Sequence, residues 1–243
     1  MNITAIIPAR YASSRFEGKP LAILHGKPMI WWVYNQVKKV TLINKVVVAL
    51  DDERIADICK EYNLDYVFTD INHTSSTSRV HEVSNIIDSD FYICINGDEP
   101  LIKPETIKEI IPNDKKDNVF VSNLMVKMKT ASEVIDSTNI KVVFNKNSDA
   151  IFFSRSPIPY PKGELTFDYY KHIGVLCYNK KGLDFFVNNK KGPLEKIEDI
   201  NELRFLENYQ AIKMIEVNAE ILSVDTPKDL NFVSAYMEKN NLI

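Results

Sequence analysis

The chain has 243 residues, of which 45% are hydrophobic and 26% are charged, as is ordinary for a folded globular protein. Its formal net charge of −3 argues against a general nucleic-acid binder, which would normally carry a basic surface. No apolar run approaches about eighteen residues and the first residues lack a basic region, so neither a membrane span nor a signal peptide is expected.

The cysteines and histidines bear on the cellular compartment and on metal binding. Cys59, Cys94 and Cys177 are widely spaced in apolar surroundings, which favours buried, reduced thiols in a cytoplasmic protein. No C-x-x-C pair occurs and the four histidines are scattered, so a zinc site is not expected.

The first half of the chain alternates short β-branched runs with helical patterns. Strands are expected at residues 3–7, 46–49, 65–68 and 91–95, and helices at residues 51–62, 79–87 and 105–111. This alternation is typical of an α/β fold in which a mainly parallel sheet carries helices on both faces.

The pattern changes after Asn118. Strands are expected at residues 120–126, 141–144, 151–154 and 221–224, a loop at 157–162, and helices at 182–187, 198–209 and 226–238. No interdomain linker is apparent. We therefore predict a single domain, residues 1–243, with an insertion at about residues 118–190.

A basic loop follows the first expected strand. It carries Arg10, Arg15 and Lys19 beside hydroxyl side chains and a glycine. Arginine grips phosphate oxygens in pairs, lysine adds a point charge, and backbone N–H groups can complete a polyphosphate site. The Walker and dinucleotide-binding motifs are absent, and a merely solvated basic loop is the alternative interpretation.

Two aspartates follow expected strands and are therefore expected at the same edge of the sheet. Asp98 comes after residues 91–95, and Asp225 comes after residues 221–224. Mg²⁺ usually takes one or two protein carboxylates together with phosphate oxygens and water. The alternatives are a turn role for Asp98 and a helix-start role for Asp225.

Seven short segments, taken together and in order, carry a family resemblance. They are residues 8–20 (PARYASSRFEGKP), 26–30 (GKPMI), 51–55 (DDERI), 96–102 (NGDEPLI), 153–159 (FSRSPIP), 171–175 (KHIGV) and 224–230 (VDTPKDL). Together they closely resemble the sugar-activating cytidylyltransferases, above all the 3-deoxy-manno-octulosonate (Kdo) cytidylyltransferases.

The resemblance implies a fold, a reaction and an assembly. The fold would be Rossmann-like, with a mixed, mainly parallel sheet and an antiparallel insertion for acceptor contacts and dimerisation. The reaction would be Mg²⁺-dependent transfer of CMP from CTP to a 2-keto-3-deoxy sugar acid, releasing pyrophosphate and serving lipopolysaccharide or capsule synthesis. CTP and the sugar acid would be its partners, and the insertion would form a homodimer.

The resemblance also assigns residues to roles. The catalytic residues would be Arg10, Arg15, Lys19 and Asp98, and the metal ligands would be Asp98 and Asp225. The nucleotide would be bound by Pro8, Ala9, Arg10, Ser13, Lys19, Ser75, Thr77, Arg79 and Asp98. The acceptor would be bound by Asn96, Arg155, His172, Tyr178, Asn201 and Glu202.

The chain departs from the family pattern near both expected binding sites. Ser76 stands for a glycine, Ser78 for an acidic residue, Asn96 for a glutamine, Leu176 for an aromatic residue and Asn201 for a glutamate. Such changes can retune an acceptor site. The alternatives to Kdo are 8-amino-Kdo, another ulosonic acid or a small phosphonate, and a nucleotide-binding homologue without turnover is a further possibility.

Overall fold

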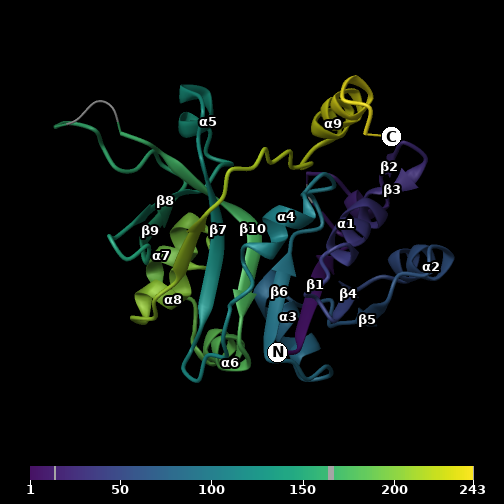
Figure 1. The fold of residues 1–243 in the computed structure, drawn as a ribbon, viewed down its shortest axis with the longest axis horizontal. Coiled ribbons are helices and arrows are strands. Elements are labelled where there is room, and N and C mark those ends of the chain that lie inside the picture. The colour runs from purple at the N-terminus through teal and green to yellow at the C-terminus, as the bar shows by residue number, and fades with distance from the viewer. Residues whose placement is uncertain (14, 164–166, 243) are drawn as a thin grey trace.

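In the computed structural model, which describes residues 1–13, 15–163 and 167–242, the chain folds around one mixed sheet of nine strands (Figure 1). The strands are β1 (Ile3–Ala9), β4 (Lys45–Leu50), β5 (Tyr66–Phe68), β6 (Phe91–Ile95), β7 (Val121–Lys127), β8 (Lys141–Phe144), β9 (Ala150–Ser154), β10 (Tyr170–Tyr178) and β11 (Lys213–Glu216). Their order is β11-β7-β10-β6-β1-β4-β5, with β8 on β10 and β9 on β8. A small hairpin of β2 (Ile23–Leu24) and β3 (Lys27–Pro28) lies apart.

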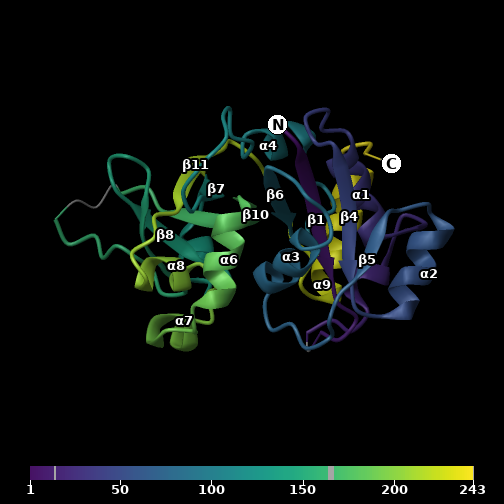
Figure 2. The same ribbon diagram turned by 90° about the horizontal axis from the view of Figure 1, so that it is seen from below.

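Helices cover both faces of this sheet (Figure 2). They are α1 (Met29–Lys38), α2 (Glu53–Glu61), α3 (Ser76–Ser84), α4 (Pro104–Lys108), α5 (Ala131–Ile135), α6 (Lys180–Asn188), α7 (Pro193–Glu198), α8 (Leu203–Glu207) and α9 (Pro227–Lys239). Successive residues of β1 serve opposite faces, as in any strand. Ala5 and Ile7 pack in the cluster that includes residues of α1, α2 and α4, whereas Ile6 packs in the cluster that includes residues of α3, α6 and α8.

The topology confirms the predicted mixed, mainly parallel sheet with helices on both faces. Strands β5, β4, β1 and β6 run parallel to one another, as the alternating pattern of the first half predicts. The antiparallel part comes from β10, which lies between β6 and β7, and from β8 and β9. The four strands described within the predicted insertion, β7, β8, β9 and β10, therefore belong to the same sheet as the first half of the chain.

Two expectations about the second half are wrong, and two of its strands were not expected. Residues 221–224 are irregular backbone instead of a strand, held in place because the Val224 N–H donates to the Asp98 carbonyl over 2.8 Å. The expected helix at 198–209 is confined to the short α8, because α7 ends at Glu198 and the chain turns at Asp199 with a φ of 52°. The unexpected strands are β10, in which every residue from 173 to 178 is buried, and the edge strand β11.

Two predictions made from the composition concern the cysteines and membrane-spanning segments. Cys59, Cys94 and Cys177 are all buried free thiols, as predicted. Within the described part of the chain, none of the helices combines the length and the apolar character that crossing a membrane requires.

Candidate active site

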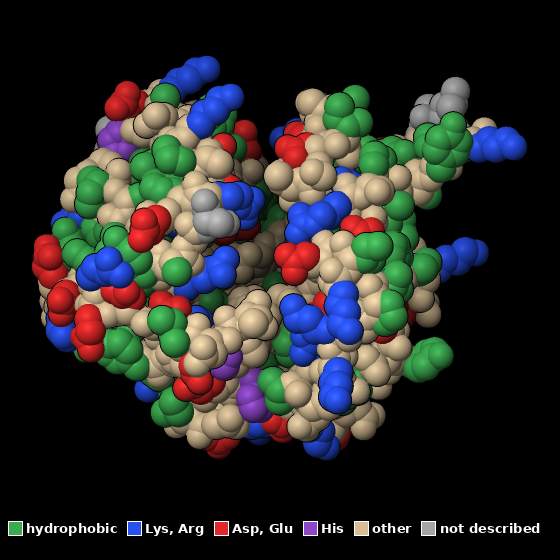
Figure 3. All heavy atoms as spheres, turned by 180° about the vertical axis from the view of Figure 1, so that it is seen from behind, with side chains coloured by type: hydrophobic (Ala, Val, Ile, Leu, Met, Phe, Trp, Pro, Cys, Tyr) green, Lys and Arg blue, Asp and Glu red, His purple; other side chains and the backbone are tan. Residues whose placement is uncertain are grey.

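A cleft of about 1250 Å³ is lined by residues from both the first and the second half of the chain. Figure 3 shows it as a deep hollow with Lys, Arg, Asp and Glu side chains along its rim. Its lining includes the loop after β1, the end of β6 and the segment before α9. Arg155, His172 and Asn201 also line it. The predicted nucleotide and acceptor regions therefore face one cavity.

Two carboxylates and two cations form a compact cluster in this cleft. The Lys19 ammonium lies 2.9 Å from Asp98 Oδ2 and 3.3 Å from Asp225 Oδ1. The Arg15 guanidinium contacts Asp225 through Nη2 at 3.0 Å and Nη1 at 3.3 Å. The tertiary structure thus brings together four predicted residues from distant parts of the sequence.

The carboxylate pair has the donor chemistry that Mg²⁺ requires. One ammonium group touches both Asp98 and Asp225, so a small cation could be shared by the same two side chains. No group of three or more metal-ligating His, Cys, Asp or Glu side chains occurs among the described residues. This arrangement fits Mg²⁺, which completes its oxygen shell with phosphate and water, better than a metal held wholly by protein.

The predicted phosphate loop borders this cluster. Pro8, Ala9, Arg10 and Ser13 line the cleft. The loop turns back at Gly18, whose φ of 65° suits glycine and whose N–H donates to the Tyr11 carbonyl over 2.9 Å. This turn returns the chain to the cleft, where Lys19 meets the two aspartates.

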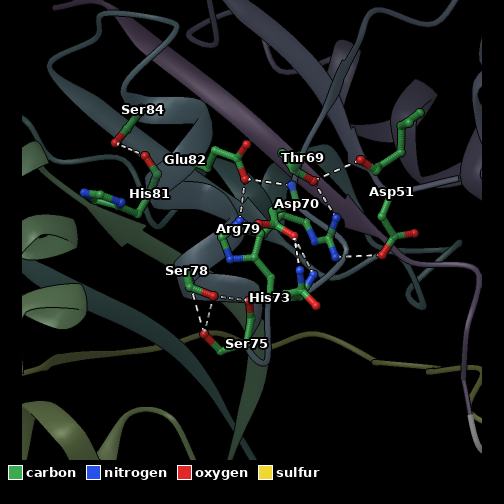
Figure 4. Close-up of polar contacts among 12 residues, drawn as sticks. Asp51, Thr69, Asp70, His73, Ser75, Ser78, Arg79, His81, Glu82 and Ser84 are labelled. Carbon is green, nitrogen blue, oxygen red and sulfur yellow. Dashed lines mark hydrogen bonds and ion pairs between the residues drawn. The ribbon is translucent and has the colours of Figure 1, made fainter. Parts of the chain in front are cut away.

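A buried ion pair supports the predicted nucleotide-binding loop around Ser75, Thr77 and Arg79 (Figure 4). Arg79 donates from Nη2 to Asp51 Oδ2 over 2.8 Å and from Nη1 to Thr69 Oγ1 over 2.5 Å. Asp51 also accepts a hydrogen bond from the Tyr11 N–H at 3.2 Å, which links this loop to the phosphate loop. Asp51 was not among the predicted site residues. Its neighbour Asp52, and not Asp51, caps α2.

Ser75 and Ser78 organise the start of α3. Ser75 is the N-cap, and its Oγ accepts a hydrogen bond from the Ser78 N–H at 3.1 Å (Figure 4). The Ser78 hydroxyl donates to the Ser75 carbonyl over 2.9 Å. Ser75 and Arg79 both line the cleft, so capping and cleft formation involve the same short segment.

Three predicted site residues lie outside the cleft lining. Thr77 and Tyr178 are each 1% exposed, and their hydroxyl oxygens are 3.3 Å apart within the core. Glu202 is also buried, and burial raises the pKa of its carboxyl to about 7. Thr77 shares the inward face of α3 with Val80, which explains why it points away from the cleft. The placement of these three side chains does not support their predicted ligand contacts.

Arg155 lines the cleft but is braced by backbone oxygens. Its Nε donates to the Glu198 carbonyl over 2.7 Å, its Nη1 to the Ser137 carbonyl over 3.1 Å and its Nη2 to the Asp199 carbonyl over 3.2 Å. A guanidinium has five N–H donors, so these contacts leave only part of it for a carboxylate. The predicted contact of Arg155 with the acceptor is therefore restricted by these backbone contacts.

Asn96 packs directly against Gly174 in the cleft. A Cβ atom at position 174 would lie 2.3 Å from Asn96 Nδ2, so the side chain at position 96 depends on a glycine opposite it. The Gly174 N–H donates to Glu99 Oε1 over 3.3 Å. Burial, with a smaller contribution from the Asp98 charge, raises the pKa of Glu99 to about 8. Neither Glu99 nor this packing was predicted, because no local pattern distinguishes them.

Comparisons with known proteins place this chain among the cytidylyltransferases. A family model described as cytidylyltransferase matches residues 4–214. The chain is 41% identical to a 3-deoxy-manno-octulosonate cytidylyltransferase from Fusobacterium nucleatum, covering 100% of this chain and 99% of the relative. It is 36% identical to an 8-amino-3,8-dideoxy-manno-octulosonate cytidylyltransferase from Shewanella pealeana, covering 97% and 98%.

Solved structures show the same relationship. A CMP:2-keto-3-deoxy-manno-octonic acid synthetase complexed with CTP matches with a TM-score of 0.92 and 35% identity, covering 99% of this chain and 100% of that chain. An inositol-1-phosphate CTP transferase from T. maritima matches with a TM-score of 0.70 and 17% identity, covering 97% and 95%, which indicates a shared fold alone.

Proposed function

The chain belongs to the 3-deoxy-manno-octulosonate cytidylyltransferase family, and we propose that it transfers CMP from CTP to the anomeric hydroxyl of Kdo. The observation that carries this proposal is the cluster of Lys19, Asp98 and Asp225 inside a cleft that also contains Arg155 and His172. A nucleoside triphosphate site and an acceptor site would then share one cavity.

The proposed reaction needs positioning and charge neutralisation. The anomeric hydroxyl loses its proton to water, a bond forms between its oxygen and the α-phosphorus, and the bond from that phosphorus to the departing pyrophosphate breaks. Arg10, Arg15 and Lys19 would hold the phosphates in line and neutralise the leaving group. Asp98 and Asp225 would hold Mg²⁺, which supplies Lewis-acid polarisation of a phosphate when it is bound.

An assay of pyrophosphate release tests this function directly. With Mg²⁺ and Kdo present, we expect turnover with CTP and little with ATP or GTP. Omission of Kdo should abolish release, because hydrolysis of CTP is not the proposed reaction. Comparable turnover with a purine triphosphate would contradict the proposed base preference.

A modified acceptor is the second candidate, favoured by Asn96 and Asn201 in the cleft and by the similarity to the Shewanella pealeana protein. Another ulosonic acid or a small phosphonate would bind through the same chemistry. The cationic and carboxylate side chains present argue against a homologue without turnover. We further infer a cytoplasmic enzyme that supplies lipopolysaccharide or capsule synthesis.

A double variant tests the acceptor choice. Asn96→Gln with Asn201→Glu changes two cleft residues, and we expect kcat/KM for Kdo relative to 8-amino-Kdo to change about tenfold. A rise on Kdo would favour a modified natural acceptor. Competition kinetics with the two acceptors would measure the change, and an unaltered ratio would show that these side chains do not select the sugar.

A homodimer is a further prediction from the insertion. Ile135 is 73% exposed and Ile151 is 59% exposed, and an apolar groove includes Ile135, Val134 and Phe167. Burial of such side chains favours association. Light scattering at micromolar concentration should give twice the chain mass of 27.9 kDa. A monomer mass for the unaltered protein would refute the prediction.

A further inference from the structure

Asn123 is a fully buried polar residue that lies behind the cleft. It belongs to β7, and the residue is 0% exposed. Its Nδ2 donates to the carbonyls of Ile173 and Val175, each over 2.9 Å. Its Oδ1 lies 3.2 Å from Nδ1 of His172, one of the residues that line the cleft.

The backbone of β10 explains why two carbonyls are available to Asn123. His172 pairs with Met125 and Leu176 pairs with Asn123, so the register of β10 against β7 shifts between these pairs. The backbone hydrogen bonds between β7 and β10 are interrupted there, as in a β-bulge. The Asn123 side-chain amide takes the place of some of them. The backbone of β10 therefore fixes the position of the Asn123 side chain.

These contacts determine which end of the amide faces the histidine. Carbonyl oxygens can only accept hydrogen bonds, so the Asn123 NH₂ group must face Ile173 and Val175. The opposite orientation would place the amide oxygen against two carbonyl oxygens. The amide oxygen therefore faces His172 Nδ1 and can only accept a hydrogen bond from it.

The same network specifies the chemistry of the imidazole. Nδ1 must carry a hydrogen to satisfy Asn123 Oδ1. Burial, with repulsion from Arg155 and Lys171, lowers the pKa of His172 to about 4, so the ring is neutral near pH 7. A neutral ring with Nδ1–H has a lone pair on Nε2. Phe153 packs edge-to-face on the ring, with centroids 6.1 Å apart.

We propose that Asn123 is a positioning residue that holds His172 in the Nδ1–H tautomer, so that Nε2 accepts a hydrogen bond from a hydroxyl group of the acceptor. The identity of that acceptor rests on the proposed function, whereas the tautomer does not. A neutral Nε2 has no hydrogen to donate to a carboxylate. His172 therefore selects a hydroxyl, and the carboxylate of the acceptor must be held by cationic side chains.

Nitrogen NMR of the unliganded protein tests the tautomer without any substrate. In ¹⁵N-histidine protein near pH 7, the His172 signals should show a protonated Nδ1 and an unprotonated Nε2. The signals that disappear in His172→Gln provide the assignment. A protonated Nε2 in the wild-type protein would overturn the proposal even if no variant of Asn123 folds.

Variants separate this role from a structural one. Asn123→Leu removes the acceptor oxygen, so we expect the Nε2–H tautomer to appear and the KM for the acceptor to rise about five- to tenfold. The KM for CTP should change less than about twofold. Ser122→Ala is the matched control, because that buried hydroxyl has no hydrogen-bond partner among the described residues.

The outcomes also distinguish this inference from the proposed function. Unchanged His172 signals in folded Asn123→Leu would overturn the positioning role. A changed tautomer with an unchanged acceptor KM would overturn the hydroxyl contact. If no sugar acid accepts CMP, the proposed function fails, while the NMR result still decides whether Asn123 sets the tautomer.

Discussion

Asp98→Asn and Asp225→Asn are each expected to lower kcat about 100- to 1000-fold while the protein remains folded. Charge neutralisation at a phosphate by a bound metal is worth several kcal/mol, and each 1.36 kcal/mol corresponds to about tenfold in rate. The two carboxylates share Lys19, so each substitution also changes the position of that cation. Initial rates at saturating Mg²⁺ and CTP would measure the loss.

The fold should survive Asp225→Asn because the nearby helix cap does not need the Asp225 carboxylate. Asp229 Oδ2 accepts hydrogen bonds from the Thr226 N–H at 2.8 Å and the Asp225 N–H at 3.1 Å, both from the backbone. Asp114→Asn is the matched control, since that exposed carboxylate pairs with Lys116 on the surface. A near-normal kcat for Asp225→Asn would assign Asp225 to a structural role.

Arg204→Met is expected to lower the free energy of unfolding by about 3 to 5 kcal/mol, since it leaves Glu195 buried without its bidentate partner. Arg204 donates to Glu195 from Nε over 2.7 Å and from Nη2 over 2.6 Å, and the Glu195 side chain is 1% exposed. A typical domain has only roughly 5 to 15 kcal/mol of stability, so the loss would be large. Urea denaturation would measure it.

Two further variants test the cause of that loss. Arg204→Met with Glu195→Gln removes the unpaired charge and should recover part of the stability. Lys116→Met breaks an exposed ion pair and should cost no more than about 1 kcal/mol. A loss below about 1 kcal/mol in Arg204→Met would show that the buried pair does not hold α7 against α8.

Local patterns predict the strands β1, β4, β5 and β6 and the helices α2, α3 and α4 of the first half, but not helix α1. The strands expected at residues 46–49 and 91–95 correspond to β4 and β6, because continuous β-branched and apolar runs are typical of strands buried on both faces. The second half is less predictable. In β10, a histidine, a glycine and a lysine interrupt the apolar pattern, and only the pairing with β7 and β6 shows why they belong to a strand.

By itself, the sequence determined the α/β class, the basic loop after β1 and the family resemblance that points to Asp98 and Asp225. These follow from periodicity, residue type and short motifs, which are local properties of the chain. Only the tertiary structure decided that Lys19 bridges Asp98 and Asp225, that Tyr178 is in the core and that Asn123 faces His172. Such contacts join residues far apart in the chain, so packing selects the direction and hydrogen-bond partners of each side chain.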